Sequence, residues 1–205
     1  MSSRPLPSQK PTKTDVVVDF RRGQIVDAAR QNFLKQGVSA STVDAIAKTA
    51  GVAKGTVYLY FASKDELLRE ILAQDLQEFH DCTVPAIRRA GSIDERLAAF
   101  VRQSLEFFDR KRDFFEQCHV EMAAIKKQAS SRIGLLFAAQ TEAWRDALAD
   151  HVKGARRADL EGRAHAIVSL VHGLALQRLR GWHTASISDT VASACHLMLK
   201  GVARG

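Results

Sequence analysis

Residues 42–61 decide the fold: they read Thr-Val-Asp-Ala-Ile-Ala-Lys-Thr-Ala-Gly-Val-Ala-Lys-Gly-Thr-Val-Tyr-Leu-Tyr-Phe. Apolar side chains recur at three- and four-residue spacing before Gly51, which predicts a short helix whose start Thr42 can cap. Gly51 ends that helix, and Val57 and Phe61, four residues apart, predict the buried face of a second short helix. A helix, a tight turn at a glycine and a second helix form the helix-turn-helix pattern.

The second helix keeps polar and aromatic side chains for its outer surface. The two tyrosines of the chain, Tyr58 and Tyr60, both lie on it, and tyrosine hydroxyls must reach water or a partner. Lysine, threonine and tyrosine side chains donate hydrogen bonds to phosphates and bases, and an apolar side chain can touch a thymine methyl group. The sequence therefore predicts a DNA-reading surface of Lys54, Gly55, Thr56, Tyr58 and Leu59, with Tyr60 at its edge.

The rest of the chain also has helical periodicity, and no segment alternates with period two for long enough to form a strand. A helix is predicted over residues 20–36, with Gly37 as its C-cap. Ser63 to Glu66 and Ser92 to Glu95 are capping boxes, and the first opens a long helix that ends near residues 81–85. Further helices are predicted at residues 92–110, 114–127, 130–152, 159–180 and 188–202. The fold class is all-α, with about nine helices.

Composition restricts the class of protein further. The chain has 205 residues, of which 46% are hydrophobic and 26% charged, as in a folded protein of one or two domains. No run of 18 residues lacks charge, and the polar N-terminus is unlike a secretory signal. Three widely spaced cysteines, Cys82, Cys118 and Cys195, argue against a disulfide framework. We therefore expect a cytoplasmic protein.

Positive charge is concentrated at the N-terminal end. Residues 1–65 hold ten of the basic and five of the acidic side chains, whereas the whole chain has a net charge of +7. This indicates a nucleic-acid-binding module joined to a near-neutral domain, although a solvated basic surface gives the same pattern. The predicted organisation is a flexible basic tail (1–19), a helix-turn-helix DNA-binding domain (20–65) and a helical ligand-binding and dimerisation domain (66–205). The tail is interpreted as a disordered end, with contacts along a duplex as the alternative.

The segment from residue 22 to residue 72 resembles the TetR family of transcriptional regulators. The residues that carry the resemblance include Ala50-Gly51-Val52 and Tyr60-Phe61. The resemblance implies an all-helical fold in which the first three helices bind DNA, the fourth links, and the rest bind a ligand and dimerise. It implies phosphate contacts from Thr42 and Lys64, at the starts of the second and fourth helices. It assigns base or phosphate contacts to Lys54, Gly55, Thr56, Tyr58 and Tyr60. Leu59 stands where the family often has a polar residue, which excludes a hydrogen-bonded base contact there.

The C-terminal domain is rich in aromatic side chains but shows no catalytic motif. An apolar cavity with a few polar groups is how proteins hold small molecules, and the alternative for each aromatic residue is simple core packing. Glu121 and Gln140 are further candidates for polar contacts. The predicted ligand-binding residues are Phe79, Phe107, Phe108, Phe114, Cys118, His119, Met122, Phe137 and Trp144.

The last two predicted helices carry apolar residues on more than one face, which is too much for a helix with a single neighbour. They are predicted to form a homodimer interface, with a monomer as the alternative. The predicted dimerisation residues are Ile167, Val171, Leu174, Leu179, Val191, Cys195 and Met198.

No metal, cofactor or enzymatic activity is predicted. His165 and His172 share a helix face but lie two turns apart, too far to bind one ion unaided. A redox-sensing role is the alternative for Cys118, but an interior thiol is usually inert packing. The predicted function is a homodimeric, ligand-responsive repressor that binds a palindromic operator in double-stranded DNA. The alternatives are an activator, a regulator without a ligand, and a helical interaction module without DNA function.

Overall fold

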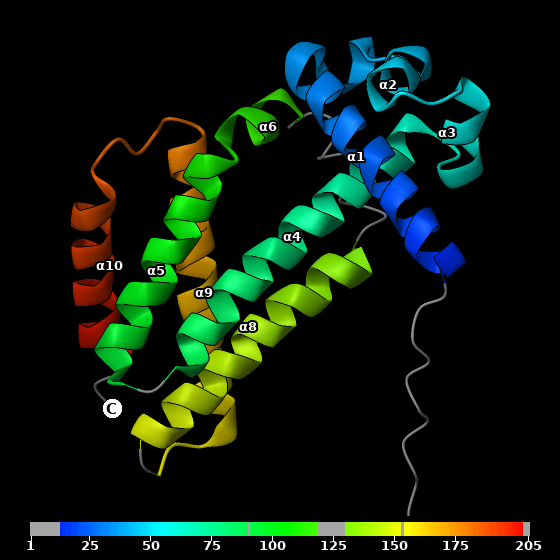
Figure 1. Ribbon diagram of the computed structural model, residues 1–205. Helices are drawn as coiled ribbons and strands as arrows, with labels where there is room; N and C mark the ends of the chain where they lie inside the picture. The colour runs from blue at the N-terminus through cyan, green and yellow to red at the C-terminus, as the bar shows by residue number, and fades with distance from the viewer. Residues whose placement is uncertain (1–12, 90, 119–129, 153, 203–205) are drawn as a thin grey trace, which may run out of the picture. The chain divides into compact units, whose positions relative to one another are not determined.

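The computed structural model describes residues 13–89, 91–118, 130–152 and 154–202, and each regular element in these ranges is a helix (Figure 1). The predicted all-α class is confirmed. The nine helices of the described residues are α1 (Lys13–Ala40), α2 (Val43–Ala50), α3 (Lys54–Tyr60), α4 (Lys64–Arg88), α5 (Ile93–Arg110), α6 (Arg112–Gln117), α8 (Ser130–His151), α9 (Arg157–Leu179) and α10 (Ile187–Val202). Within this part of the chain, no helix has the length and apolar character needed to cross a bilayer.

The chain divides into two compact units between Leu68 and Arg69, close to the predicted boundary at residue 65. The first unit contains α1 to α3 and the start of α4. The second contains the remainder of α4 and all later helices. Helix α4 is thus the one described helix that belongs to both units.

The core of the first unit consists of side chains from the helices α1, α2 and α3. Phe33 of α1, Ile46 of α2 and Val57 of α3 are almost completely buried. Helix α1 bends at Gly37, whose φ of 81° lies in the region that favours glycine. The predicted helix end at this glycine therefore coincides with the observed bend.

Two helix boundaries differ from the sequence-based predictions. Helix α1 begins at Lys13, so the predicted flexible tail is wrong for residues 13–19; the three prolines that suggested a tail all precede Lys13. Helix α4 continues through Pro85 to Arg88. Pro85 lies on the exposed side, while Val84 and Ile87 are buried and hold the last turn in place. A proline on the exposed side leaves the freed carbonyl open to water, which lowers the cost of continuing the helix.

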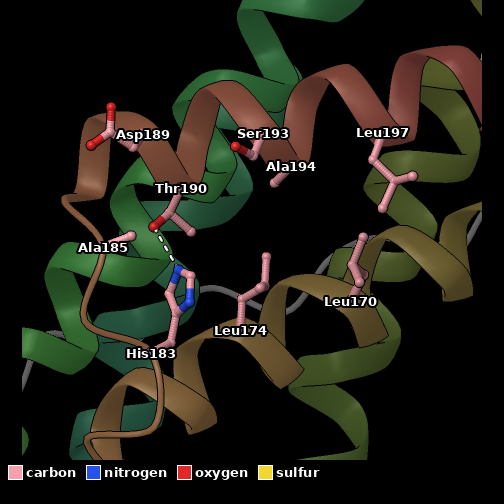
Figure 2. Close-up of a pocket in the computed structure, with 9 residues that line it drawn as sticks. All are labelled: Leu170, Leu174, His183, Ala185, Asp189, Thr190, Ser193, Ala194 and Leu197. Atoms are coloured by element: carbon pink, nitrogen blue, oxygen red, sulfur yellow. Dashed lines mark hydrogen bonds between the residues drawn. The ribbon is translucent and has the colours of Figure 1, made fainter.

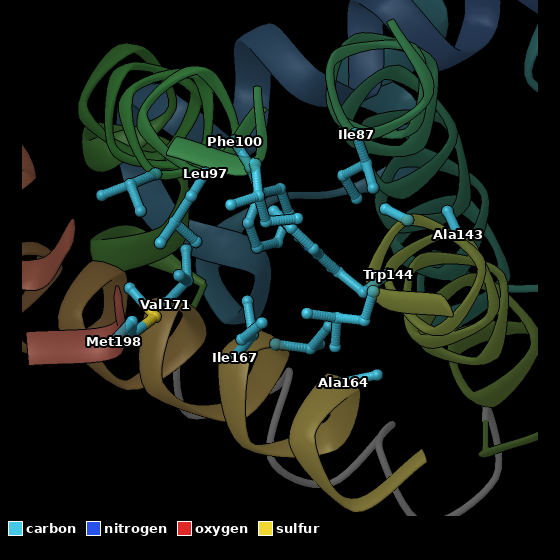
Figure 3. Packing of buried hydrophobic residues seen from close by; sticks show 14 of the residues in the cluster. Ile87, Leu97, Phe100, Ala143, Trp144, Ala164, Ile167, Val171 and Met198 are labelled. Carbon is cyan, nitrogen blue, oxygen red and sulfur yellow. The ribbon is translucent and has the colours of Figure 1, made fainter. Parts of the chain in front are cut away.

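The second unit has its own hydrophobic core, in which α5 packs against α9 and α10 and α8 packs against α9. Trp144 of α8 is fully buried, and its ring centroid lies 5.6 Å from that of Phe100 of α5 (Figure 3). Around these rings lie apolar side chains from α4, α5, α9 and α10. The core therefore joins all the long helices of this unit.

Candidate DNA-binding surface and regulatory domain

The turn between α2 and α3 has the geometry that the sequence predicts. Thr42 caps α2, because its hydroxyl oxygen accepts a hydrogen bond from the Ala45 backbone N–H at 3.1 Å. Gly51 adopts a left-handed conformation (φ 66°, ψ 33°), and its N–H donates to carbonyls at the end of α2. A side chain at this φ would be strained, so glycine allows the chain to reverse directly into α3.

Helix α3 is anchored by one buried side and leaves its other side uncovered. Val57 and Phe61 are 1% exposed, whereas Tyr58 is 50% and Leu59 is 83% exposed. Apart from its two chain neighbours and the backbone of its own helix, a Cβ atom added at Gly55 would meet no atom within 4 Å, so the protein's own packing does not require glycine there. Tyr60 and Thr56 are half-buried, and Lys54 and Thr42 are exposed.

The ammonium group of Lys54 is held by a carboxylate of the preceding helix. Its Nζ donates to Asp44 Oδ2 at 2.8 Å, and both side chains are more than half exposed. This hydrogen bond, with the attraction of the Asp44 charge, raises the pKa of Lys54. A phosphate that contacts Lys54 must therefore compete with Asp44.

Replacing Asp44 with Asn is expected to strengthen DNA binding about threefold at low salt, because an exposed ion pair of this kind is weak and its loss makes Lys54 available to a phosphate. The change frees Lys54 and removes a negative charge beside the DNA-reading surface. The logarithm of the binding constant should also fall more steeply with the logarithm of salt concentration, by about one charge per chain. Fluorescence anisotropy across a salt series measures both quantities. Unchanged affinity and salt slope would show that Lys54 does not contact phosphate.

Lys64 has a different environment from the one that the resemblance implies. Its Nζ donates to the carbonyl oxygens of Val38, Ser39 and Ser41 at 2.9, 3.1 and 2.7 Å. A lysine ammonium has three donors, so the three carbonyls occupy all of them. Lys64 thus fixes the chain between α1 and α2 to the start of α4, and a phosphate contact would cost it one of these bonds.

Of the two capping boxes predicted from the sequence, one has the expected pair of hydrogen bonds and the other has a different partner for its carboxylate. At Ser92, both reciprocal hydrogen bonds with Glu95 are present. At Ser63, the serine oxygen accepts from the Glu66 N–H at 3.2 Å, but the Glu66 carboxylate accepts from the Ala62 N–H at 2.7 Å, one residue earlier. In both cases a carboxylate lies at a helix N-terminus, where the helix dipole favours negative charge.

The second unit brings several of the predicted ligand-binding aromatics together. The ring centroid of Phe79 of α4 lies 5.0 Å from that of Phe107 and 5.3 Å from that of Phe108. Phe115, which the sequence-based reasoning missed, extends this cluster at 5.5 Å from Phe108. Phe114 contacts Phe115, and Cys118 is buried. Trp144 instead contacts Phe100 in the core. His119, Glu121 and Met122 lie outside the described residues.

His172 joins this cluster from α9. Its ring centroid lies 5.6 Å from that of Phe79 and 4.5 Å from that of Phe137, and its Nε2 has no hydrogen-bond partner within the described ranges. Burial lowers the pKa of His172 to about 4. Nearby on α8, Gln140 donates to Thr83 at 2.7 Å, while its buried Oε1 also has no partner in those ranges. Buried polar atoms without partners are costly and are candidates for contacts with a bound molecule.

Acidification is expected to destabilise the second unit through His172. Because the folded-state pKa of about 4 is below the ordinary 6.5, the unfolded chain binds the proton more tightly. The contribution of neutral His172 to the free energy of unfolding is fully present above pH 6.5 and is lost as the pH falls toward 4. The free energy of unfolding should drop by about 2 kcal/mol between pH 7 and pH 5 from this residue. Urea titrations of wild type and His172→Phe at both pH values measure the difference; equal pH dependence would contradict the assignment.

Two ion-pair clusters hold the junction of α5 and α6 to other helices. Lys111 Nζ lies 2.9 Å from the buried Asp75 Oδ1 and 2.7 Å from Glu78 Oε2, both on α4. Burial opposes the charge on Lys111, but the hydrogen bonds to these two carboxylates leave its pKa raised. Asp109 accepts a hydrogen bond from Arg178 of α9 at 2.7 Å. The Lys111 ion pairs thus hold the junction of α5 and α6 to α4, and the Arg178 hydrogen bond holds the end of α5 to α9.

The predicted dimerisation residues divide into two groups in the structure. Ile167, Val171, Val191 and Met198 are at most 6% exposed and belong to the core of the second unit itself, so these predicted dimerisation residues pack within their own chain. Leu174, Leu179 and Cys195 are half-buried. A helix with apolar residues on two faces uses one of them to pack inside its own chain, and the sequence pattern does not distinguish the two faces.

A shallow apolar groove of about 200 Å³ lies between α9 and α10 (Figure 2). Leu174 and Leu170 line it from α9, and Ala194 and Leu197 line it from α10. Leu197 is 63% exposed, and the turn between the helices carries Trp182 at 72% exposure. Elsewhere on α9, Leu176 is 44% exposed. Leu174 was among the predicted dimerisation residues, whereas Leu176, Trp182 and Leu197 were not.

Together, the capped α2, the left-handed Gly51 turn and the uncovered α3 define a helix-turn-helix protein, and a second helical unit follows this motif. The family model described as "Bacterial regulatory proteins, tetR family" matches residues 25–71. Residues 25–71 of the chain therefore form a TetR-family DNA-binding domain.

Individual relatives agree with this assignment. The chain is 36% identical over 78 residues to the fatty acid metabolism regulator protein of Bacillus subtilis (strain 168), a match that spans 38% of the chain and 40% of that relative. It is 28% identical to the transcriptional activator FasR of Mycolicibacterium smegmatis, over 80% of the chain and 73% of FasR. The chain thus spans less than half the length of the first of these relatives.

The fold extends beyond the matched domain. The crystal structure of the transcriptional regulator FadR from Bacillus subtilis, in complex with stearoyl-CoA, superposes with a TM-score of 0.64 at 19% identity, covering 88% of this chain and 98% of FadR. At this identity the likeness concerns the fold, and it includes the second unit as well as the first.

Proposed function

We propose that the protein is a DNA-binding transcriptional repressor that acts as a homodimer on a palindromic operator and releases it when a small molecule binds. The observation that carries the proposal is the exposed side of α3, where Tyr58 and Leu59 are 50% and 83% exposed beside an open Gly55. A short helix whose outer face offers aromatic, apolar and hydroxyl groups has what is needed to enter a major groove.

The direct test is binding of the purified protein to DNA from immediately upstream of its own coding region, with unrelated DNA of equal length as the control. Specific binding should persist at salt concentrations that abolish binding to the control DNA. Equal binding to both DNAs would show that this DNA is bound only through non-specific attraction to a basic surface. In that case, selection from random DNA would determine whether the protein recognises an operator elsewhere.

The homodimer is supported by the apolar groove between α9 and α10 and by the exposed apolar side chains Leu197 of α10 and Trp182 of the turn between the two helices. Exposed apolar patches of this kind mark interaction sites. A twofold dimer would present two copies of α3 to successive major-groove turns, about 34–36 Å apart, and would therefore favour a palindromic site. Two chains per DNA site in the same binding assay, measured by sedimentation, is the expected stoichiometry.

For the effector we propose an apolar molecule of the fatty acyl class, received by the aromatic cluster of Phe79, Phe107, Phe108 and Phe115. The buried polar atoms of His172 and Gln140, which lack partners within the described ranges, would contact its polar group. Two similar proteins from Bacillus subtilis support this class: one is named a fatty acid metabolism regulator, and the other was crystallised in complex with stearoyl-CoA. Oleoyl-CoA and oleic acid, titrated against the operator complex, provide the first test.

The route from effector to DNA would run along α4. This helix is held by Lys111 through Asp75 and Glu78 in the second unit and begins at Lys64 in the first. An effector that favours one arrangement of α4 weakens DNA binding in proportion to its differential affinity for that arrangement. A ligand that binds without altering the affinity for DNA would refute this coupling.

Activation is the alternative sign of regulation, favoured by the name of FasR, which is a transcriptional activator. Repressors and activators share the DNA-binding geometry, so the binding assay does not separate them. Transcription of the gene downstream of the operator, measured with and without the protein, does separate them.

A further inference from the structure

Leu59 is the most exposed large hydrophobic side chain among the described residues, at 83%. Burial of a leucine side chain contributes to stability, and an exposed leucine does not make this contribution. It lies in the middle of the surface of α3 that the proposed function places against DNA, next to Tyr58. A partner group for Leu59 on the DNA is therefore expected to be apolar.

The remaining residues of α3 supply few of the usual base-reading groups. Its sequence, Lys-Gly-Thr-Val-Tyr-Leu-Tyr, contains no arginine, asparagine, glutamine, aspartate or glutamate. Guanine is most often read by arginine or lysine and adenine by asparagine or glutamine, each through two hydrogen bonds. The single cation of the helix, Lys54, is bound to Asp44. Direct readout from this helix thus rests on hydroxyl groups and on apolar contact.

The space beside Leu59 can accommodate a small apolar group. A helical side chain leans toward the helix N-terminus, over the residue four positions earlier. For Leu59 that residue is Gly55, which has no side chain. Apart from its two chain neighbours and the backbone of its own helix, no atom lies within 4 Å of a Cβ added there. The flank of the leucine side chain is therefore uncovered on the side toward Gly55.

We infer that Leu59 is a specificity-determining residue that reads the 5-methyl group of a thymine in each operator half-site, with Gly55 leaving the room that the methyl group needs. Thymine is the one standard base that presents a methyl group in the major groove. This inference rests on the proposed function, because it requires that α3 enters the major groove.

The test removes the methyl group without changing base pairing. An operator obtained by selection from random DNA is synthesised with each thymine replaced in turn by deoxyuridine, and dissociation constants are measured for wild type and Leu59→Ala. For wild type, one position in each half-site should weaken binding by about fourfold, the effect of one buried methyl group. Leu59→Ala loses the contact in both half-sites. It should therefore bind the thymine operator about as weakly as wild type binds an operator with deoxyuridine at that position in both half-sites, and it should not distinguish these two operators.

A second variant and a spectroscopic control keep the result interpretable. Leu59→Met retains an apolar side chain and should retain sensitivity to the methyl group. Circular dichroism should be the same for all three proteins, because residue 59 is exposed and contributes little to folding.

The inference is overturned if wild type tolerates deoxyuridine at every position, or if Leu59→Ala keeps the same sensitive position as wild type. A uniform loss of affinity in Leu59→Ala, on all sequences alike, also overturns it and would indicate a contact with the sugar–phosphate backbone. Failure of the selection to yield any specific sequence would instead refute the proposed function.

Discussion

A variant that carries both Lys54→Ala and Tyr58→Ala is expected to bind the operator about a thousandfold more weakly than wild type. Each lost base or phosphate contact costs about 1–3 kcal/mol, and a dimer loses each contact twice, so the total is at least about 4 kcal/mol. Both side chains are exposed in the free protein, so their loss should leave helicity and dimerisation intact. Anisotropy titrations, circular dichroism and sedimentation measure the three quantities.

Matched variants separate the causes of this loss. Arg102→Ala removes one positive charge from an exposed position of α5 and should leave operator affinity within about twofold of wild type, because Arg102 does not belong to the unit that carries α3. Tyr58→Phe keeps the ring and removes the hydroxyl, so it reports the hydrogen bond alone. An operator affinity of the double variant close to that of wild type would show that α3 does not read the DNA.

Replacing Trp144 with Ala is expected to reduce the free energy of unfolding by about 3–5 kcal/mol, the range for removing a large buried aromatic side chain. Trp144 is fully buried and packs edge-on against Phe100, which is also fully buried. Natural domains have only about 5–15 kcal/mol of stability, so this variant should melt far below wild type, as followed by far-ultraviolet circular dichroism.

Trp144→Phe provides the contrast that identifies the cause. The Nε1 of Trp144 has no hydrogen-bond partner among the described residues, so phenylalanine removes a donor that contributes no hydrogen bond while it keeps much of the ring. Because an unsatisfied buried donor costs about 1–3 kcal/mol, its removal should offset most of the lost packing, and Trp144→Phe should melt close to wild type. A loss as large as that of Trp144→Ala would show that Nε1 makes a structural contact.

Helix boundaries at the helix-turn-helix could be predicted because they depend on residues close in sequence. Thr42 and Gly51 act through hydrogen bonds to groups three or four residues away, and Val57 and Phe61 share a face by helical spacing alone. The outward side of α3 follows from the same periodicity, so the exposure of Tyr58 and Leu59 could be predicted without tertiary contacts.

The predicted role of Lys64 shows where such local reasoning ends. Sequence position and resemblance both place a cation at the start of α4, next to a predicted DNA surface. Its ammonium, however, donates to three carbonyls that lie 23 to 26 residues earlier in the chain. A bond over that distance depends on how α1, α2 and α4 pack, which no local pattern specifies.

By itself, the sequence determined an all-helical protein with a helix-turn-helix near its N-terminus, because helix periodicity, caps and turn glycines are properties of neighbouring residues. Only the tertiary structure decided which apolar residues of α9 and α10 are core and which remain uncovered: Val171 is buried, whereas Leu197 is exposed. The physical reason is that amphipathic spacing gives a helix its apolar faces, while the choice of which face is covered belongs to the helices packed against it.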